Sequence, residues 1–223
     1  MSNLESYKIK KDIVRENLNK YTRKAYKFLP EIKNPKILDI GCGTGVPTIE
    51  LAKLSGGHII GMDIDEKSLN LLRRKIKDLG LVNQVNVIKD SIISMDFPEN
   101  SFNIIWSEGS AFVMGFENSI NYWSRFLKHN GFLIIHDEIT DKTKKLGSLK
   151  KHGYLLIAEF ELSENLWWYE YYKPLTLLIQ TFLKKYPNDF ELNNELKKDM
   201  IEIEKCKSKS VVFSSFFVIM KKI

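Results

Sequence analysis

Cysteine, histidine and long apolar runs are scarce in this 223-residue sequence, and each shortage excludes a class of protein. The two cysteines, Cys42 and Cys206, are far apart and have no partner at metal-ligand spacing, so we expect neither a disulfide framework nor a metal site. No apolar run approaches the roughly 20 residues that cross a bilayer. The first eleven residues also lack the apolar core of a signal peptide. We therefore expect a cytoplasmic protein with reduced thiols.

The charge balance is basic, with a net charge of +6, while 43% of the residues are hydrophobic, as in soluble globular proteins. A basic balance can indicate nucleic-acid binding. Here the lysines are spread along the chain and do not interleave with aromatic residues, which favours solvated lysine faces over an RNA-binding surface. We do not expect nucleic acid as a partner, and the oligomeric state stays open.

Segments with strand and helix patterns alternate along the chain, which predicts an α/β fold with a mainly parallel sheet. Strands are predicted at 36–40, 58–63, 85–89, 102–107, 132–136, 154–162 and 211–220. Helices are predicted at 12–29, 46–54, 65–79, 117–128, 174–185 and 188–205. No linker divides the chain, so we expect one domain over residues 1–223. Residues 1–30 would form an N-terminal helical cap, and 163–206 an aromatic and helical insertion that could act as a lid.

The strongest local signal is the string from Leu38 to Gly45, Leu-Asp-Ile-Gly-Cys-Gly-Thr-Gly, which links a strand to a helix. Glycines at such a turn permit positive φ angles and let a ligand lie against the backbone. A dinucleotide site needs its third glycine at position 46, where this chain has Val46. The negative charge of Asp39 would also repel a pyrophosphate, whereas it would attract a cationic cofactor. The string therefore disfavours a nicotinamide-dependent dehydrogenase.

Acidic residues end the next two predicted strands. Asp63 is placed to accept hydrogen bonds from both hydroxyls of a ribose, whereas Asp65 fits the N-cap of the following helix better. Asp90 can accept from an exocyclic adenine amine, and Ile64 and Ile92 could enclose the ring. The pattern predicts a nucleoside site at the carboxyl ends of the strands.

These motifs together resemble the class I S-adenosylmethionine-dependent methyltransferases over roughly residues 30–140. The glycine string, Asp63, the Asp90-Ser91 pair and the Leu127-Lys128-His129-Asn130-Gly131 turn follow in the family's order, although the family usually has proline-glycine in that turn. Residues 104–117 and 162–167 are also similar to a small-molecule, quinone-biosynthesis-like subgroup. The resemblance implies a Rossmann-like, seven-stranded, mostly parallel sheet with the last strand antiparallel and helices on both faces. It also implies S-adenosylmethionine as cofactor and S-adenosylhomocysteine as product.

The cofactor-binding residues expected from the motifs and the resemblance are Asp39, Gly41, Cys42, Gly43, Gly45, Asp63, Ile64, Asp90, Ser91, Ile92 and Ser107.

Candidate catalytic and acceptor-binding residues follow from the chemistry of methyl transfer. The loop Ser107–Ser110 is expected to face the methyl group, and Glu108 and His136 are the candidate general bases; a purely structural histidine is the favoured interpretation of the latter. Glu108, Trp167 and Tyr171 are the candidate substrate-binding residues. The aromatic density at 163–172 is explained equally well by core packing.

The sequence thus predicts a methyltransferase that acts on a small molecule. The loop after residue 107 lacks the motif that binds amines of nucleic-acid bases, which disfavours base methylation. An RNA or protein methyltransferase on the same fold, and a cofactor-binding module without catalysis, remain as alternatives.

Overall fold

The computed structural model describes residues 2–208 and 213–223, and the chain divides into two compact units. The sheet unit comprises Lys20–Glu161 and Phe216–Ile223, and the helical unit comprises Met1–Asn19 and Leu162–Ser215. Each unit is assembled from two separate stretches of sequence. No single linker therefore marks a boundary between them, which explains why the composition along the chain shows none.

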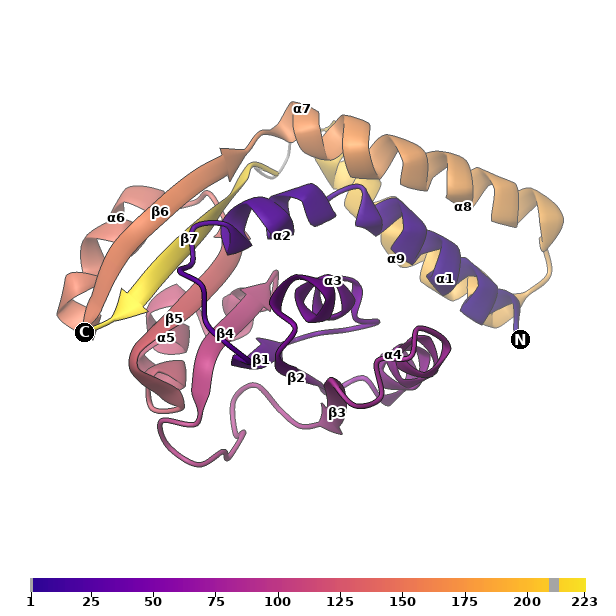
Figure 1. The fold of residues 1–223 in the computed structure, drawn as a ribbon. Coiled ribbons are helices and arrows are strands. Elements are labelled where there is room, and N and C mark those ends of the chain that lie inside the picture. Colours follow the sequence, from indigo (N-terminus) through magenta and orange to yellow (C-terminus); the bar gives the residue numbers. More distant parts are fainter. Residues whose placement is uncertain (1, 209–212) are drawn as a thin grey trace. The chain divides into compact units, whose positions relative to one another are not determined.

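The sheet unit is built on seven strands in the described part of the chain, in the order β3-β2-β1-β4-β5-β7-β6 (Figure 1). The strands are β1 Lys36–Ile40, β2 His58–Asp63, β3 Val85–Lys89, β4 Phe102–Glu108, β5 Leu127–Glu138, β6 Tyr154–Leu162 and β7 Ser215–Lys222. Strands β1 to β5 pair in parallel, and β7 runs antiparallel. The predicted Rossmann-like sheet is confirmed.

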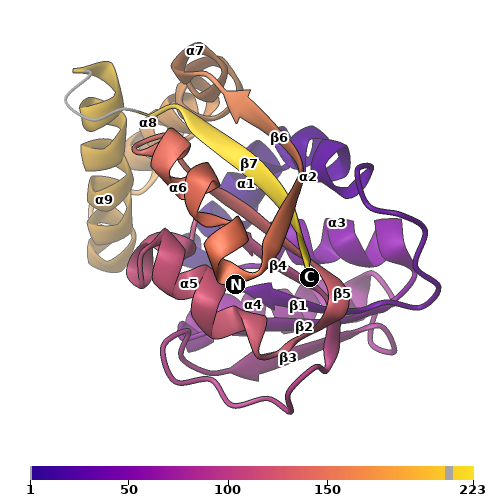
Figure 2. The same cartoon turned by 90° about the vertical axis from the view of Figure 1, so that its left-hand side faces the viewer.

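Helices cover both faces of this sheet, which accounts for its nearly continuous apolar strands. Figure 2 shows α5 and α6 on one side of the strands and α2 and α3 on the other. On the first side, Trp123 of α5 belongs to a buried cluster with Ile105, Ile135 and Phe216 of the strands. The helical elements of this unit are α2 Asn19–Tyr26, α3 Val46–Ser55, α4 Glu66–Asp78, η1 Ala111–Val113, α5 Phe116–Ser124, α6 Lys142–Ser148 and η2 Lys150–His152.

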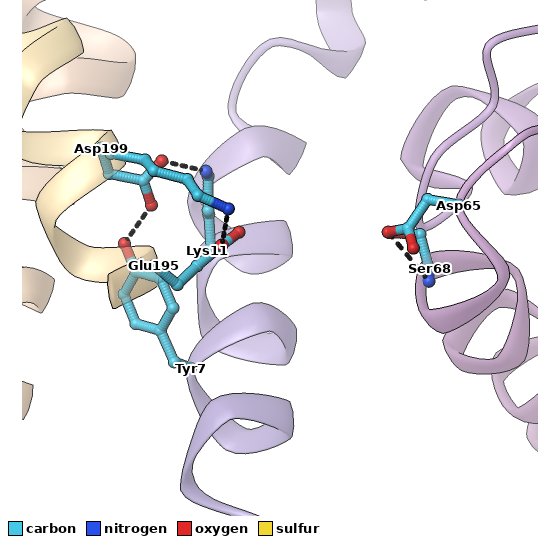
Figure 3. Close-up of polar contacts among 7 residues, drawn as sticks. Tyr7, Lys11, Asp65, Ser68, Glu195 and Asp199 are labelled. Atoms are coloured by element: carbon cyan, nitrogen blue, oxygen red, sulfur yellow. Dashed lines mark hydrogen bonds and ion pairs between the residues drawn. The ribbon is translucent and has the colours of Figure 1, made fainter. Parts of the chain in front are cut away.

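Helix α4 begins where the sequence predicts, and Asp65 is its N-cap. The Asp65 carboxylate accepts hydrogen bonds from the backbone N–H groups of Lys67 and Ser68 at 3.1 and 3.3 Å, and from Ser68 Oγ at 2.5 Å (Figure 3). These N–H groups have no partner inside the helix, so the side chain satisfies them. Asp63 is thereby left out of the capping role.

The predicted helix 12–29 is wrong, because the chain forms two helices there, α1 Asn3–Glu16 and α2. Helix α1 starts earlier because Ser2 and Glu5 form a capping box, in which each side chain accepts from the other's backbone N–H. The break near Asn17 falls at the boundary between the two units. The apolar stripe runs through both helices, so periodicity alone could not reveal the break.

Three other predicted elements have an end that differs by more than two residues from the observed one. Strand β5 extends beyond 132–136 because Leu127 pairs with Phe102, and a register shift between Phe102 and Ile104 accommodates the Asn130 turn. Helix α5 accordingly ends at Ser124 instead of residue 128. The last strand, predicted at 211–220, is observed at Ser215–Lys222, and residues 211 and 212 of that prediction lie outside the described residues.

The helical unit comprises α1, α7 Glu164–Trp167, the π-helix η3 Trp168–Tyr172, α8 Lys173–Lys185 and α9 Phe190–Lys207. The elements α7, η3 and α8 follow one another without a break (Figure 1). The Tyr7 ring of α1 meets Phe182 of α8 edge-on, with the ring centroids 5.3 Å apart. Among the helices of residues 2–208 and 213–223, none has the length and apolar character needed to cross a membrane.

A buried polar cluster joins α1 to α9 within the helical unit (Figure 3). Asp199, only 4% exposed, accepts from the Tyr7 hydroxyl at 2.5 Å on one oxygen and from Lys11 Nζ at 2.6 Å on the other. Burial, followed by the charge of Asp199, raises the pKa of Tyr7. A carboxylate this deeply buried needs both donors to offset its loss of water.

We predict that Tyr7→Phe lowers the free energy of unfolding by about 1–3 kcal/mol, because one oxygen of Asp199 loses its donor without gaining water. Chemical denaturation followed by circular dichroism measures the change. Tyr169→Phe is the matched control, since Tyr169 is 64% exposed. Equal effects of the two substitutions would contradict a stabilising role for the Tyr7 hydroxyl.

Candidate functional site

The glycine loop between β1 and α3 is held against the end of β2 by its own backbone. The N–H groups of Gly41 and Cys42 both donate to the carbonyl of Met62, at 2.8 and 3.0 Å. Gly43 N–H donates to Asp63 Oδ2 at 2.8 Å. Lys75 of α4 donates to the carbonyl of Thr44 at 2.9 Å. Four successive loop residues are thus tied to elements that follow later in the chain.

Two of the loop glycines are required by space as well as by conformation. Gly41 and Gly45 have φ angles of +72° and +82°, which side chains rarely adopt. A Cβ at Gly41 would also collide with Oγ of Ser110, and a Cβ at Gly45 with Leu72 of α4. The loop can pass this close to its neighbours only because both positions lack a side chain.

A cleft of about 460 Å³ lies beside this loop at the carboxyl ends of the parallel strands. Its described lining residues are Gly41, Met62, Asp63, Ile64, Asp90, Ser91, Ile92, Ile93, Gly109, Ser110, Phe112 and Val113. Six of the residues predicted from sequence to bind the cofactor are among them: Gly41, Asp63, Ile64, Asp90, Ser91 and Ile92. The volume is within the range of small-molecule sites.

The polar side of the cleft is formed by Asp63 and Asp90. Asp63 Oδ1 accepts the Asp65 N–H at 2.9 Å, while its Oδ2 accepts from Gly43, so the carboxylate is held in place by one bond to each oxygen. Each carboxylate oxygen can accept a second bond. Asp90 Oδ1 accepts the Ser91 N–H at 2.7 Å. Both carboxylates are therefore oriented by the backbone and can still accept from a ligand.

The apolar side of the cleft contains residues that sequence reasoning missed. Ile64, predicted, is 68% exposed, and it is joined in the lining by Ile93, Phe112 and Val113, each more than half exposed. Phe112 and Val113 belong to the short helix η1 after β4. Such a concentration of exposed apolar side chains suits a flat aromatic ring. The available signal was the apolar run Ala111–Met114, which directly follows the loop expected to face the methyl group.

Asp39 lies under the glycine loop, 2% exposed, and accepts from Thr48 Oγ1 at 2.6 Å. The pKa of Asp39 is raised from 3.8 to about 7: burial is the largest cause, the carboxylates of Glu108 and Asp63 add to the rise, and the Thr48 hydrogen bond opposes it. Three acidic groups therefore lie near one another beside the loop. A cation bound nearby would favour the ionised form of Asp39.

Glu108 and His136 are paired across the neighbouring parallel strands β4 and β5 but have different surroundings. Glu108 Oε1 accepts from Thr22 Oγ1 of α2 at 2.7 Å and from Trp106 Nε1 at 2.9 Å. The His136 ring is 5% exposed and stacks on Phe217, with the centroids 4.3 Å apart. The fixed, half-buried carboxylate of Glu108 suits a functional role better, whereas the packing of His136 agrees with a structural histidine.

The remaining predicted cofactor residues support the loop or lie beneath it. Cys42 is buried, which raises the pKa of its thiol. Ser107 is fully buried, and its Oγ has no hydrogen-bond partner in the part of the chain that the structure describes. Gly43 and Gly45 shape the loop by their positive φ angles. These residues are outside the described lining of the cleft.

Trp167 and Tyr171 belong to the helical unit, where both have internal contacts. Trp167 Nε1 donates to Ser215 Oγ at 2.8 Å. The Tyr171 ring, 9% exposed, meets the rings of Trp167 and Tyr172 edge-on at centroid distances of 5.9 and 5.1 Å. These contacts account for much of the aromatic density that the sequence shows at 163–172.

Residues 37–131 match a family model described as a methyltransferase domain. This segment begins in β1, includes the glycine loop and every described lining residue of the cleft, and ends in β5. Residues 37–131 therefore resemble methyltransferase domains in sequence, and the resemblance inferred from the motifs is confirmed over this segment.

Relatives agree with this assignment. The chain is 33% identical over 106 residues to the ubiquinone/menaquinone biosynthesis C-methyltransferase UbiE of Pasteurella multocida, covering 46% of this chain and 40% of that protein. The chain spans less than half the length of the curated relatives it matches.

Solved structures share the fold across most of the chain. A methyltransferase from Geobacter sulfurreducens, in complex with S-adenosyl-L-homocysteine, has 16% identity and a TM-score of 0.71, with 93% of this chain and 91% of that chain covered. The [4+2]-cyclase SpnF has 17% identity and a TM-score of 0.74, with coverage of 91% and 80%.

The buried Asp39 of the sheet unit leads to a prediction about pH. Because the folded state holds the Asp39 proton more tightly than the unfolded chain, its contribution to stability falls as pH rises from about 4 to about 7. Asp39→Asn keeps an oxygen for Thr48 and removes this titration. We expect the ligand-free variant to gain stability relative to the wild type over that window.

Denaturation at several pH values measures this difference, with Asp96→Asn as a control because Asp96 is exposed. A stability difference between wild type and Asp39→Asn that is the same at pH 4 and pH 7 would contradict the burial of an acid with a raised pKa.

Proposed function

We propose that this protein transfers a methyl group from S-adenosylmethionine to a small-molecule acceptor and releases S-adenosylhomocysteine. The observation that supports this most is the character of the cleft, which combines two oriented carboxylates and an exposed apolar wall with a nearby acidic cluster beside a glycine-rich loop. A nucleoside with a cationic tail matches each of these parts. A dinucleotide would bring a pyrophosphate to the same acidic region.

The residues present fit S-adenosylmethionine in a specific way. Asp63 would accept from the two ribose hydroxyls, and Asp90 from the adenine amine. Ile64, Ile92 and Phe112 would contact the ring faces. Gly41 would allow the tail to lie against the backbone. Asp39 is not among the described lining residues of the cleft, so its negative charge would attract the cationic cofactor without direct contact.

The cofactor supplies an electrophilic methyl group on a positively charged sulfur. The chain then has to hold the acceptor in line with that group and keep water away. The Ser107–Ser110 loop, which brings Gly109 and Ser110 to the cleft, would border the reacting atoms. Glu108, held by Thr22 and Trp106, would take a proton from an acceptor that enters protonated.

A small-molecule acceptor is supported by the chain's similarity to a relative named for quinone biosynthesis. The spread of lysines along the sequence supports the same choice over nucleic acid.

We also propose a cytoplasmic location, since Cys42 and Cys206 are both free thiols. The cyclase among the structural neighbours shows that this fold serves other reactions, so methyl transfer needs a direct assay.

We predict that Asp63→Ala weakens binding of S-adenosylmethionine and S-adenosylhomocysteine by roughly 30- to 700-fold. Loss of two charge-assisted hydrogen bonds costs roughly 2–4 kcal/mol, which sets this range. Isothermal titration calorimetry measures it. Because Asp63 also accepts from Gly43 and Asp65, thermal unfolding of the free variant must show that the loop region still folds.

Asp96→Ala is the control, since it removes an exposed carboxylate from outside the described lining of the cleft. Unchanged affinity in a folded Asp63→Ala protein would rule out the ribose role. NAD, titrated in parallel, should not bind; tight NAD binding would overturn the proposed cofactor.

We further propose that Trp167, Tyr171 and Glu108 contact the acceptor. If so, at least one of the variants Trp167→Phe and Tyr171→Phe should have a turnover more than tenfold lower than the wild type. The cofactor affinity of both variants should change little. Both substitutions keep most of the packing that the structure shows. Methyl transfer to extracted small molecules, with radiolabelled cofactor, provides the assay. A loss of thermal stability with full activity would assign the two side chains to packing alone.

A further inference from the structure

The sheet has two edges, and they are built differently. At one edge, β3 is five residues long, and its exposed side chains are the polar Asn86 and Lys89. At the other edge, β6 is nine residues long, about 30 Å, and contains neither lysine nor proline. Proteins usually protect an open edge with charge, proline or short length. The β3 edge is short and contains a lysine, whereas β6 is long and is charged only in its second half, at Glu159 and Glu161.

The exposed side of β6 is apolar over consecutive residues. Leu155, Leu156 and Ile157 are 48%, 43% and 43% exposed, the longest run of exposed large apolar residues in the described chain. Since successive residues of a strand point to opposite faces, apolar surface is present on both faces of this edge. Ile223, 53% exposed, lies beside the run, because its N–H donates to the carbonyl of Gly153. Water is a poor partner for this surface.

The charges at the two ends of β6 are opposite in sign. Lys150 and Lys151, both exposed, come just before the strand, and Glu159 and Glu161 lie in its second half. Lys142 of α6 bridges to both glutamates at 2.6 Å, yet both remain exposed. A strand that is preceded by lysines in η2 and contains glutamates in its second half is complementary in charge to a second copy running in the opposite direction.

We propose that β6 pairs antiparallel with β6 of a second copy of this chain, so that the two sheets join across a twofold axis. Pairing centred on Leu156 sets Leu155 of each copy opposite Ile157 of the other. It also brings Lys151 of each copy towards Glu161 of the other. The open backbone N–H and C=O groups of both edges are satisfied in this arrangement. Neither the cleft nor the proposed methyl transfer takes part in the pairing.

The contact is small, so the dimer should form at protein concentrations on the order of micromolar to tens of micromolar. Sedimentation velocity over a concentration series measures the association. Leu156→Lys places a charge at the centre of the contact and should leave a monomer. Leu177→Lys, at a helical-unit residue that is 59% exposed, is the matched control and should still form dimers.

Charge reversal tests the direction of pairing. Lys151→Glu and Glu161→Lys, made singly, should each weaken the dimer roughly tenfold, because each faces like charges in two symmetric places. The double variant should recover most of the affinity. Slower amide exchange at residues 155–158 with rising protein concentration would locate the contact directly.

A wild-type protein that stays monomeric throughout the series would overturn the proposal. So would a dimer that withstands Leu156→Lys, or one that the double charge reversal fails to restore. Circular dichroism and cofactor titration of each variant show that the fold and the cleft are unaffected, because none of the substituted residues is among the described lining of the cleft.

Discussion

The attachment of the glycine loop to the end of β2 is the constraint on which the site depends. One carbonyl, that of Met62, accepts from two successive loop N–H groups, and the neighbouring Asp63 carboxylate accepts from a third. The backbone of this loop has positive φ angles at residues 41, 43 and 45. Glycine adopts such angles without strain, which explains why all three positions are glycine. The same bonds orient Asp63, so the shape of the loop and the direction of its main polar group have one origin.

The site also contains an electrostatic cost. Asp39 is buried near two other acids, and the hydrogen bond from Thr48 lowers its pKa. Without a cation this arrangement opposes folding at neutral pH, because the ionised form is poorly solvated. With a cation bound, the same charges become favourable. If the proposed cofactor binds here, the domain exchanges some stability in the free state for affinity towards a positively charged ligand, as is common at functional sites.

The helical unit follows a different principle from the sheet unit. Its helices are held by a buried carboxylate with two donors and by a run of aromatic rings along η3, while the sheet unit relies on apolar packing on both faces of its strands. Removing one hydrogen-bond donor from a buried carboxylate lowers the free energy of unfolding strongly. The intact ion pair, by contrast, adds little stability over a well-packed apolar contact. The polar cluster therefore specifies how α1 meets α9 more than it stabilises the unit.

The sequence alone determined the elements and residues that depend on local patterns. Strands β1, β2 and β3 have the predicted bounds, because short apolar runs end there at glycines or charged residues. Six predicted residues meet in one cleft because the carboxyl ends of parallel strands lie at one edge of the sheet.

Tertiary structure decided what depends on residues far apart in the chain. The predicted helix 12–29 breaks close to the chain position that divides the two units, and β5 lengthens because Leu127 pairs with Phe102. Phe112 lines the cleft because β4 ends beside it and η1 follows directly. Glu108 is held by Thr22, which lies 86 residues earlier in the chain. No local pattern encodes such contacts, since each exists only once the sheet has brought its strands together.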